Sequence, residues 1–203
     1  MTPPSRALAF TIYLCAFVVG GVLMGFEMLG SRYLFPYFGG GIGTWASLIS
    51  TVLCALAIGY FAGSAIVALY PTQKTIAVAI LIAAAYLAFV PATADGAMQY
   101  ILDNLGDGAP ATLVASTALL LVPLTLLGTF SPIAVSLLTH STEQAGRVAG
   151  LVYGVSTIGN VVGTLLTTFT LIPAFGSRAI TYIFAFTLAA CAALLFVPSV
   201  RRA

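Results

Sequence analysis

Apolar residues dominate the chain in six long runs, separated by short stretches rich in polar residues, glycine or proline. The runs cover about residues 8 to 30, 44 to 70, 75 to 92, 111 to 138, 146 to 172 and 178 to 197. Each has roughly the 20 residues that a helix needs to cross a bilayer. Backbone polar groups in hydrocarbon must be satisfied within their own segment. We therefore expect one all-α domain, residues 1 to 203, with six transmembrane helices.

Composition supports a membrane protein and excludes a nucleic-acid-binding one. The 203 residues are 61% hydrophobic and 6% charged, with a scattered net charge of +2 and no basic run. Such a chain cannot cover a soluble core with polar surface, and it offers no track of cations for phosphates. The first run follows Arg6 as a secretory signal would, but it continues through Met24 without a small-residue cleavage site. We expect it to be an uncleaved first span in the lipid bilayer.

The basic residues predict the orientation of the spans. Lysines and arginines near the span ends divide five to two between the two sides: Arg6, Lys74, Arg147, Arg201 and Arg202 against Arg32 and Arg178. The positive-inside rule then places both termini in the cytoplasm, of a bacterial inner membrane by preference. The opposite side would hold the loop 93 to 110, which contains three aspartates and a short interfacial helix.

Two matching glycine patterns suggest an internal repeat. "IGYFAGS" at 58 to 64 and "IGNVVGT" at 158 to 164 lie three spans apart, as do "LMG" at 23 to 25 and "LLG" at 126 to 128. An offset of three spans inverts the topology, which predicts a 3+3 inverted repeat (units 8 to 92 and 111 to 197) resembling half of a major-facilitator transporter. Chance matches in glycine-rich helices are the alternative. In either case the pattern predicts close helix packing at Gly59, Gly63, Gly159 and Gly163.

Glu27 is the one acidic residue inside a predicted span. A charged side chain at membrane depth costs a few kcal/mol, so it requires a reason. Three uses compete: a proton-titrating group, a ligand for a cation or amine, and an ion pair with Arg32. Residues five apart on a helix diverge by about 140°, so the ion pair requires a break near Gly30.

The fifth span carries a second polar cluster. Thr157, Asn160 and Thr164 lie on one arc of the helix together with Thr168 and three glycines at 146, 150 and 154. This face would line a pathway and bind a substrate or ion. Alternatively, the threonines bond their own helix carbonyls and Asn160 joins helices.

The remaining polar and aromatic residues give no catalytic or cofactor site. Trp45, Tyr33 and Tyr37 flank span ends and are explained first by an interfacial aromatic belt, with binding as the alternative. His140 is the sole histidine and the three cysteines are dispersed, which argues against a metal site. We expect no cofactor and no enzymatic activity.

Four stretches resemble the membrane region of the fused major-facilitator and spermidine synthase-like proteins: "EMLGSRYLFPYFGGGIGTWASLI" (27 to 49), "IGYFAG" (58 to 63), "LLGTFSPIAVSLL" (126 to 138) and "AGRVAGLVYGVSTIGNVVGTLLTTFTLIPAFGSR" (145 to 178). The resemblance implies a six-to-eight-helix membrane region that precedes a cytosolic synthase-like domain. No synthase-like segment follows within the 203 residues, so the resemblance implies no aminopropyl transfer here. The chain departs from the family in "SAIVALYPTQK" and at Ser136, which leaves cytoplasmic contacts open.

Two hypotheses about function follow. The first is a small secondary transporter that acts as a homodimer, with a cationic solute such as a polyamine or a metal ion. The second is a membrane anchor or scaffold for a separate, cytosolic spermidine synthase-like protein. A helical bundle of unrelated purpose is a third reading.

Overall fold

The computed structural model describes residues 6–196, and all its regular structure is helical. The helices run in the order α1 (Arg6–Phe38), α2 (Ile42–Leu69), α3 (Gln73–Leu105), α4 (Ala109–Gly128), α5 (Phe130–Leu138), α6 (Thr142–Leu166), the π-helical segment η1 (Thr167–Leu171), α7 (Ile172–Ala174) and α8 (Ser177–Phe196). Together they form six segments that are long and apolar enough to cross a membrane. The prediction of an all-α integral membrane protein with six spanning helices is confirmed.

Two spans are interrupted close to a proline. The fourth span breaks at Thr129, between α4 and α5, three residues before Pro132. Because Pro132 has no N–H, the helical bond that it would give to the carbonyl of Gly128 is missing. The fifth span widens into η1 just before Pro173, and the N–H of Ile172 reaches back five residues to the carbonyl of Thr167. Both interruptions thus lie close to a proline, and the π segment was not foreseen.

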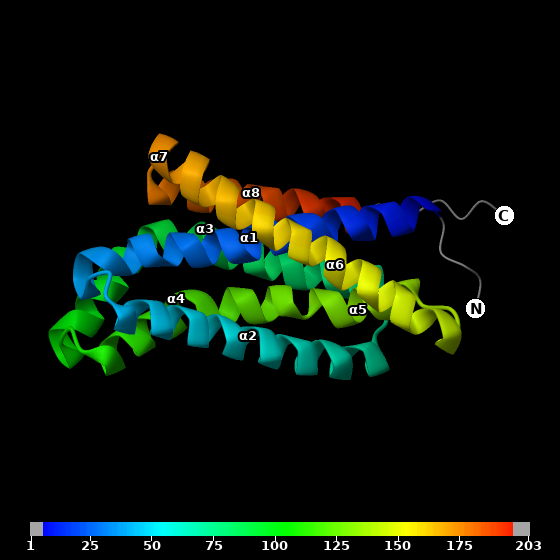
Figure 1. Cartoon of the computed structure of the whole chain (residues 1–203), viewed down its shortest axis with the longest axis horizontal. Helices are drawn as coiled ribbons and strands as arrows, with labels where there is room; N and C mark the ends of the chain where they lie inside the picture. The colour runs from blue at the N-terminus through cyan, green and yellow to red at the C-terminus, as the bar shows by residue number, and fades with distance from the viewer. Residues whose placement is uncertain (1–5, 197–203) are drawn as a thin grey trace.

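The helices pack as a bundle in which most neighbours are not consecutive in the chain (Figure 1). The three most extensive interfaces are α1 with α6, α2 with α4, and α3 with α8. Smaller ones join α3 with α4 and α1 with α8. α2 therefore packs mainly on α4 and α6 mainly on α1, and α2 and α6 share no extensive interface with each other.

The third span is longer than predicted. We expected it to end at 92 and a loop to follow from 93 to 110, but α3 continues without a break to Leu105. Buried Ala94, Met98 and Ile101 follow a helical spacing along this extension. The prediction failed because it used apolar length alone, while polar residues at the outward positions of this segment reduce its hydropathy.

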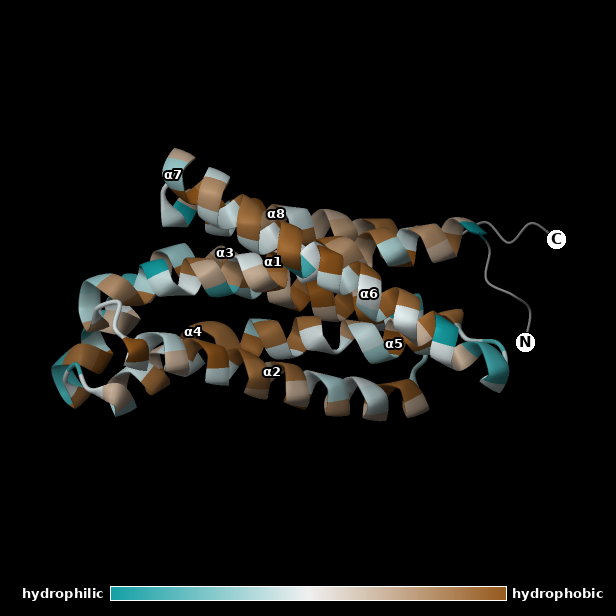
Figure 2. Ribbon diagram, viewed as in Figure 1, coloured by the Kyte–Doolittle hydropathy of each residue, from teal (hydrophilic) through white to brown (hydrophobic). Residues whose placement is uncertain are grey.

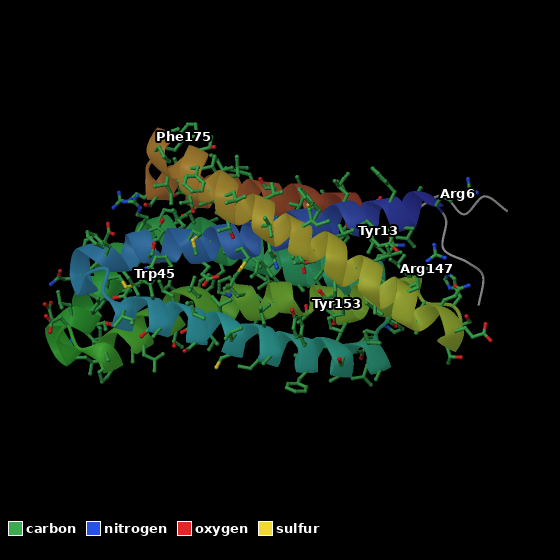
Figure 3. The ribbon with its side chains drawn as sticks, in the orientation of Figure 1. Arg6, Tyr13, Trp45, Arg147, Tyr153 and Phe175 are labelled. Carbon is green, nitrogen blue, oxygen red and sulfur yellow. The ribbon has the colours of Figure 1, made fainter. Side chains whose placement is uncertain are left out.

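Polar residues gather at the two ends of the bundle and apolar residues fill the middle (Figure 2). Arg6 and Arg147 lie at one end, and Trp45 and Phe175 lie toward the other (Figure 3). We call these the Arg147 end and the Arg32 end; Arg178 begins α8 at the Arg32 end, where it pairs with Asp95 of α3. Arg201 and Arg202, which contributed to the predicted orientation, lie outside the described residues. Which end faces the cytoplasm stays a prediction.

Candidate functional site

Glu27 lies within the bundle and is 6% exposed. It is about 16 Å along α1 from the helix end at Phe38, at 1.5 Å per residue, which places it well inside the span. Its burial follows from its neighbours on α1, since Phe26, Leu29 and Gly30 are buried with it. A carboxylate therefore sits at membrane depth within a chain whose other spans carry few charges.

The direction of Glu27 follows from the contacts of the residues around it. At about 100° per residue, Gly20 lies within about 20° of Glu27 and Gly30 about 60° to the other side. Gly20 is next to Ser156 and Asn160 of α6, whereas Gly30 is next to Leu48 of α2 and Leu120 of α4. Glu27 therefore points between α6 on one side and α2 with α4 on the other.

This sector of α1 is incompletely covered at two of its positions, although Gly20 and Glu27 themselves are buried. Met24 and Ser31, both within about 60° of Glu27, are half-buried. The helices on the two sides, α2 and α6, form no extensive interface with each other. They meet through Tyr60 and Tyr153, whose rings are 6.2 Å apart in an edge-to-face arrangement. We call the sector of α1 between α2 and α6, defined by Gly20, Met24, Glu27 and Ser31, the open sector.

The carboxylate of Glu27 has no hydrogen-bond or ion-pair partner among the described residues. The ion pair with Arg32, one of the three predicted uses, does not form. α1 runs unbroken through Gly30, so Arg32 stays about 140° away around the helix, and its side chain is exposed. Both oxygens of the Glu27 carboxylate lack a partner in the described part of the chain, but neither is fully buried. A small part of the carboxylate therefore remains accessible.

Glycines bring α1 and α6 into backbone contact beside the open sector. A Cβ atom at Gly159 would lie 2.0 Å from the carbonyl oxygen of Phe17, and one at Gly163 would lie 2.0 Å from that of Gly21. On α1, a Cβ at Gly20 would lie 2.3 Å from the carbonyl oxygen of Ser156. Such distances leave no room for side chains, so each of these positions requires glycine. The glycines of α1 were not singled out in the sequence, although Gly21 and Gly25 have the same four-residue spacing.

The polar residues of α6 are placed unequally. The side-chain oxygen of Asn160 is buried against Gly20 without a hydrogen-bond partner among the described residues. Thr164 donates to the carbonyl of Asn160 at 2.9 Å, which is the local bond given as its alternative use. Thr157 is exposed on the outer side of the helix. Of these three predicted residues, Asn160 alone adds an unpaired polar group near α1 and the open sector.

The equivalent glycines of α2 pack on the interrupted fourth span. A Cβ at Gly59 would lie 2.5 Å from the carbonyl oxygen of Thr125, and one at Gly63 would lie 2.6 Å from the ring of Pro132. Gly128 faces Gly59 across this interface. The break at Thr129 and the glycines of α2 therefore fit against each other, and this contact holds α2 at the edge of the open sector.

The arrangement is suited to binding a positive charge. A carboxylate in a low-dielectric setting interacts strongly with a proton or an ammonium group that reaches it. Among residues 6–196, no group of three His, Cys, Asp or Glu side chains could hold a metal ion. A divalent ion prefers several oxygen ligands, so the single acid favours a proton or an organic cation.

Comparison with known proteins gives no assignment: no family model, no curated protein and no solved structure matches this chain.

Proposed function

We propose that the chain is half of a small secondary transporter, in which two copies assemble as a homodimer around a pathway and Glu27 binds the transported or coupled cation. The observation that carries the proposal is Glu27 itself: a buried carboxylate at membrane depth, without a cationic partner among the described residues, that points into the open sector. Intramembrane acids in such positions mark ion and proton paths. The substrate class that fits best is a small organic cation or a proton, with a polyamine as the first solute to test.

The packing of the helices supports an inverted repeat. If α1, α2 and α3 are exchanged with the fourth, fifth and sixth spans, the α1 and α6 interface becomes the α4 and α2 interface. The same exchange converts α3 with α4 into α8 with α1, and it leaves α3 with α8 unchanged. A bundle of two related three-helix units has this property, and such units form a shared binding site between them in secondary transporters.

The composition of the fifth span supports a second copy. Of the six spans it has the lowest mean hydropathy, yet it is also the least buried. A helix that faces lipid all round is expected to be the more apolar one. Cβ atoms at Gly146, Gly150 and Gly154 would meet nothing within 4 Å, so this row of α6 is free for another helix to approach closely. A second copy placed on α2 and α6 would cover this row and enclose the open sector.

Transport by reconstituted vesicles tests the proposal. We expect spermidine uptake into proteoliposomes to move protons, reported by a pH dye trapped inside, and we expect Glu27→Gln to abolish both signals. Glu143→Gln is the matched control because it makes the same chemical change at an exposed residue in the first turn of α6, and it should transport like the wild type. Uptake by Glu27→Gln that equals the wild type from acidic to basic pH would refute the role of Glu27.

The oligomeric state tests the second part of the proposal. Single-molecule counting in bilayers should find two copies per particle. A solitary chain that co-purifies with a cytosolic protein would instead favour the anchor hypothesis.

A further inference from the structure

A cavity of about 350 Å³ lies at the Arg32 end of the bundle, where α1, the start of α2 and η1 meet. α1 contributes Met28, Ser31 and Arg32 to its wall, α2 contributes Thr44 and Trp45, and η1 contributes Thr168. The wall contains one cationic side chain and no acidic one. The wall of the cavity is therefore positively charged. The negatively charged Glu27 does not line it.

Arg32 brings unused hydrogen-bond donors to this cavity. Its guanidinium forms no hydrogen bond or ion pair with any described residue, although it carries five N–H donors. The other arginine at this end, Arg178, differs because its guanidinium is bonded to the carboxylate of Asp95. One arginine at this end is therefore neutralised within the fold, and the other is left free beside a cavity.

Two further donors in the wall are also uncommitted. The hydroxyl of Thr168 is fully buried and has no partner among residues 6–196. The indole N–H of Trp45 makes no hydrogen bond with the described chain either. By contrast, Ser31 donates to the carbonyl of Met28 at 2.7 Å and Thr44 donates to that of Gly39 at 2.9 Å, so their protons are occupied.

The local backbone explains why Thr168 is free. In a regular helix a threonine hydroxyl bonds the carbonyl four residues before it, as Thr164 does with Asn160. Thr168 lies in the π-helical segment, where the wider turn alters this geometry. A π-helical turn of this kind is frequently found at functional sites.

We propose that this cavity binds an oxyanion, a carboxylate or a phosphate, through the guanidinium of Arg32 and the indole N–H of Trp45, and that the buried, unpartnered hydroxyl of Thr168 turns toward the bound oxyanion. A carboxylate or a phosphate accepts two parallel hydrogen bonds from a guanidinium. Such charge-assisted hydrogen bonds are stronger than hydrogen bonds between neutral groups. The start of α2 adds a favourable field because its first turn carries no acidic residue and no side-chain cap. The source of the oxyanion is either a soluble solute or a lipid headgroup. The proposal does not depend on transport through Glu27.

Trp45 makes the test specific, because it is the only tryptophan of the chain and it lies in the wall of the cavity. The full chain is placed in phosphatidylcholine nanodiscs, and its tryptophan fluorescence is recorded while inorganic phosphate or acetate is added at constant ionic strength. In a second arm, phosphatidylglycerol replaces part of the lipid. A saturable change with phosphate or acetate assigns a soluble oxyanion, and a change with phosphatidylglycerol alone assigns a lipid headgroup.

Substitutions decide whether the cavity is responsible. Arg32→Gln should weaken the response at least about tenfold, the loss expected for a charge-assisted hydrogen bond. Thr168→Val keeps the shape and removes the hydroxyl, and it should weaken binding about fivefold. Arg178→Gln and Glu143→Gln should respond like the wild type. The first of these controls removes a cation from the same end, and the second removes an exposed charge from the first turn of α6.

The proposal is overturned if neither the soluble anions nor the anionic lipid changes the fluorescence. It is also overturned if Arg32→Gln, shown by gel filtration and thermal denaturation to be folded, responds like the wild type. Loss of the response in Arg178→Gln but not in Arg32→Gln would equally place the anion elsewhere.

Discussion

Gly159 of α6 has no room for a side chain, and Gly159→Ala tests this directly. The added Cβ would lie 2.0 Å from the carbonyl oxygen of Phe17, whereas ordinary contacts begin at 3.4 Å. Because the opposing atom belongs to the backbone, α1 and α6 must separate locally by about 1.4 Å, the difference between these two distances. Overpacking of this kind costs about 1–3 kcal/mol. The better helix propensity of alanine returns about 0.5–1 kcal/mol.

Gly154→Ala is the matched control on the same helix. Its Cβ would meet nothing within 4 Å, so only the gain in helix propensity remains. The propensity gain is common to both variants, so they should differ in stability by the overpacking cost of about 1–3 kcal/mol, or by about 2–12 °C in thermal midpoint for a chain of this size. The assay is thermal denaturation of purified, monomeric protein in detergent. Equal midpoints for the two variants would show that α1 and α6 do not touch at Gly159.

Two further substitutions test the outer surface and the core. Gly150→Leu should raise the thermal midpoint of the single copy by about 1–3 °C, because nothing surrounds this position and leucine has the better helix propensity, but it should weaken the dimer about tenfold in a bilayer fluorescence-transfer assay. An unchanged dimer would place the interface on another surface. Tyr33→Phe removes a buried hydrogen bond of 2.9 Å to Thr181 and should lower the midpoint by about 2–4 °C, whereas the exposed Tyr100→Phe should not. A midpoint for Tyr33→Phe equal to that of Tyr100→Phe would contradict the contact.

Features that depend on the bilayer could be predicted from the sequence. Six apolar runs were sufficient to identify six spanning helices, because a helix must be long and apolar to cross hydrocarbon. The interruption of the fourth span near Pro132 has an equally local cause, since proline removes a helical hydrogen bond wherever it occurs. Such features rest on local chemistry, so they do not require knowledge of which helices are neighbours.

Features that depend on neighbours could not be predicted in the same way. The sequence offered an ion pair between Glu27 and Arg32 as one of three uses, and only the unbroken course of α1 excludes it. The free hydroxyl of Thr168 depends on the π-helical segment, which no residue pattern announced. The extension of α3 to Leu105 depends on burial against its neighbours. In each case the decisive information is which group lies opposite, and a single sequence does not contain it.

The ring contact between Tyr60 of α2 and Tyr153 of α6 is a weak link between two helices that share no extensive interface. It is the point at which the two flanking helices touch, and Tyr153 lies in the half of the bundle away from Trp45 (Figure 3). An edge-to-face pair contributes about 0.5–1.5 kcal/mol, which is a preference of roughly two- to thirteenfold for the joined rings. Thermal motion can therefore separate the two rings repeatedly without unfolding the protein. The two tyrosines thus join α2 to α6 more weakly than the glycine interfaces join α2 to α4 and α1 to α6.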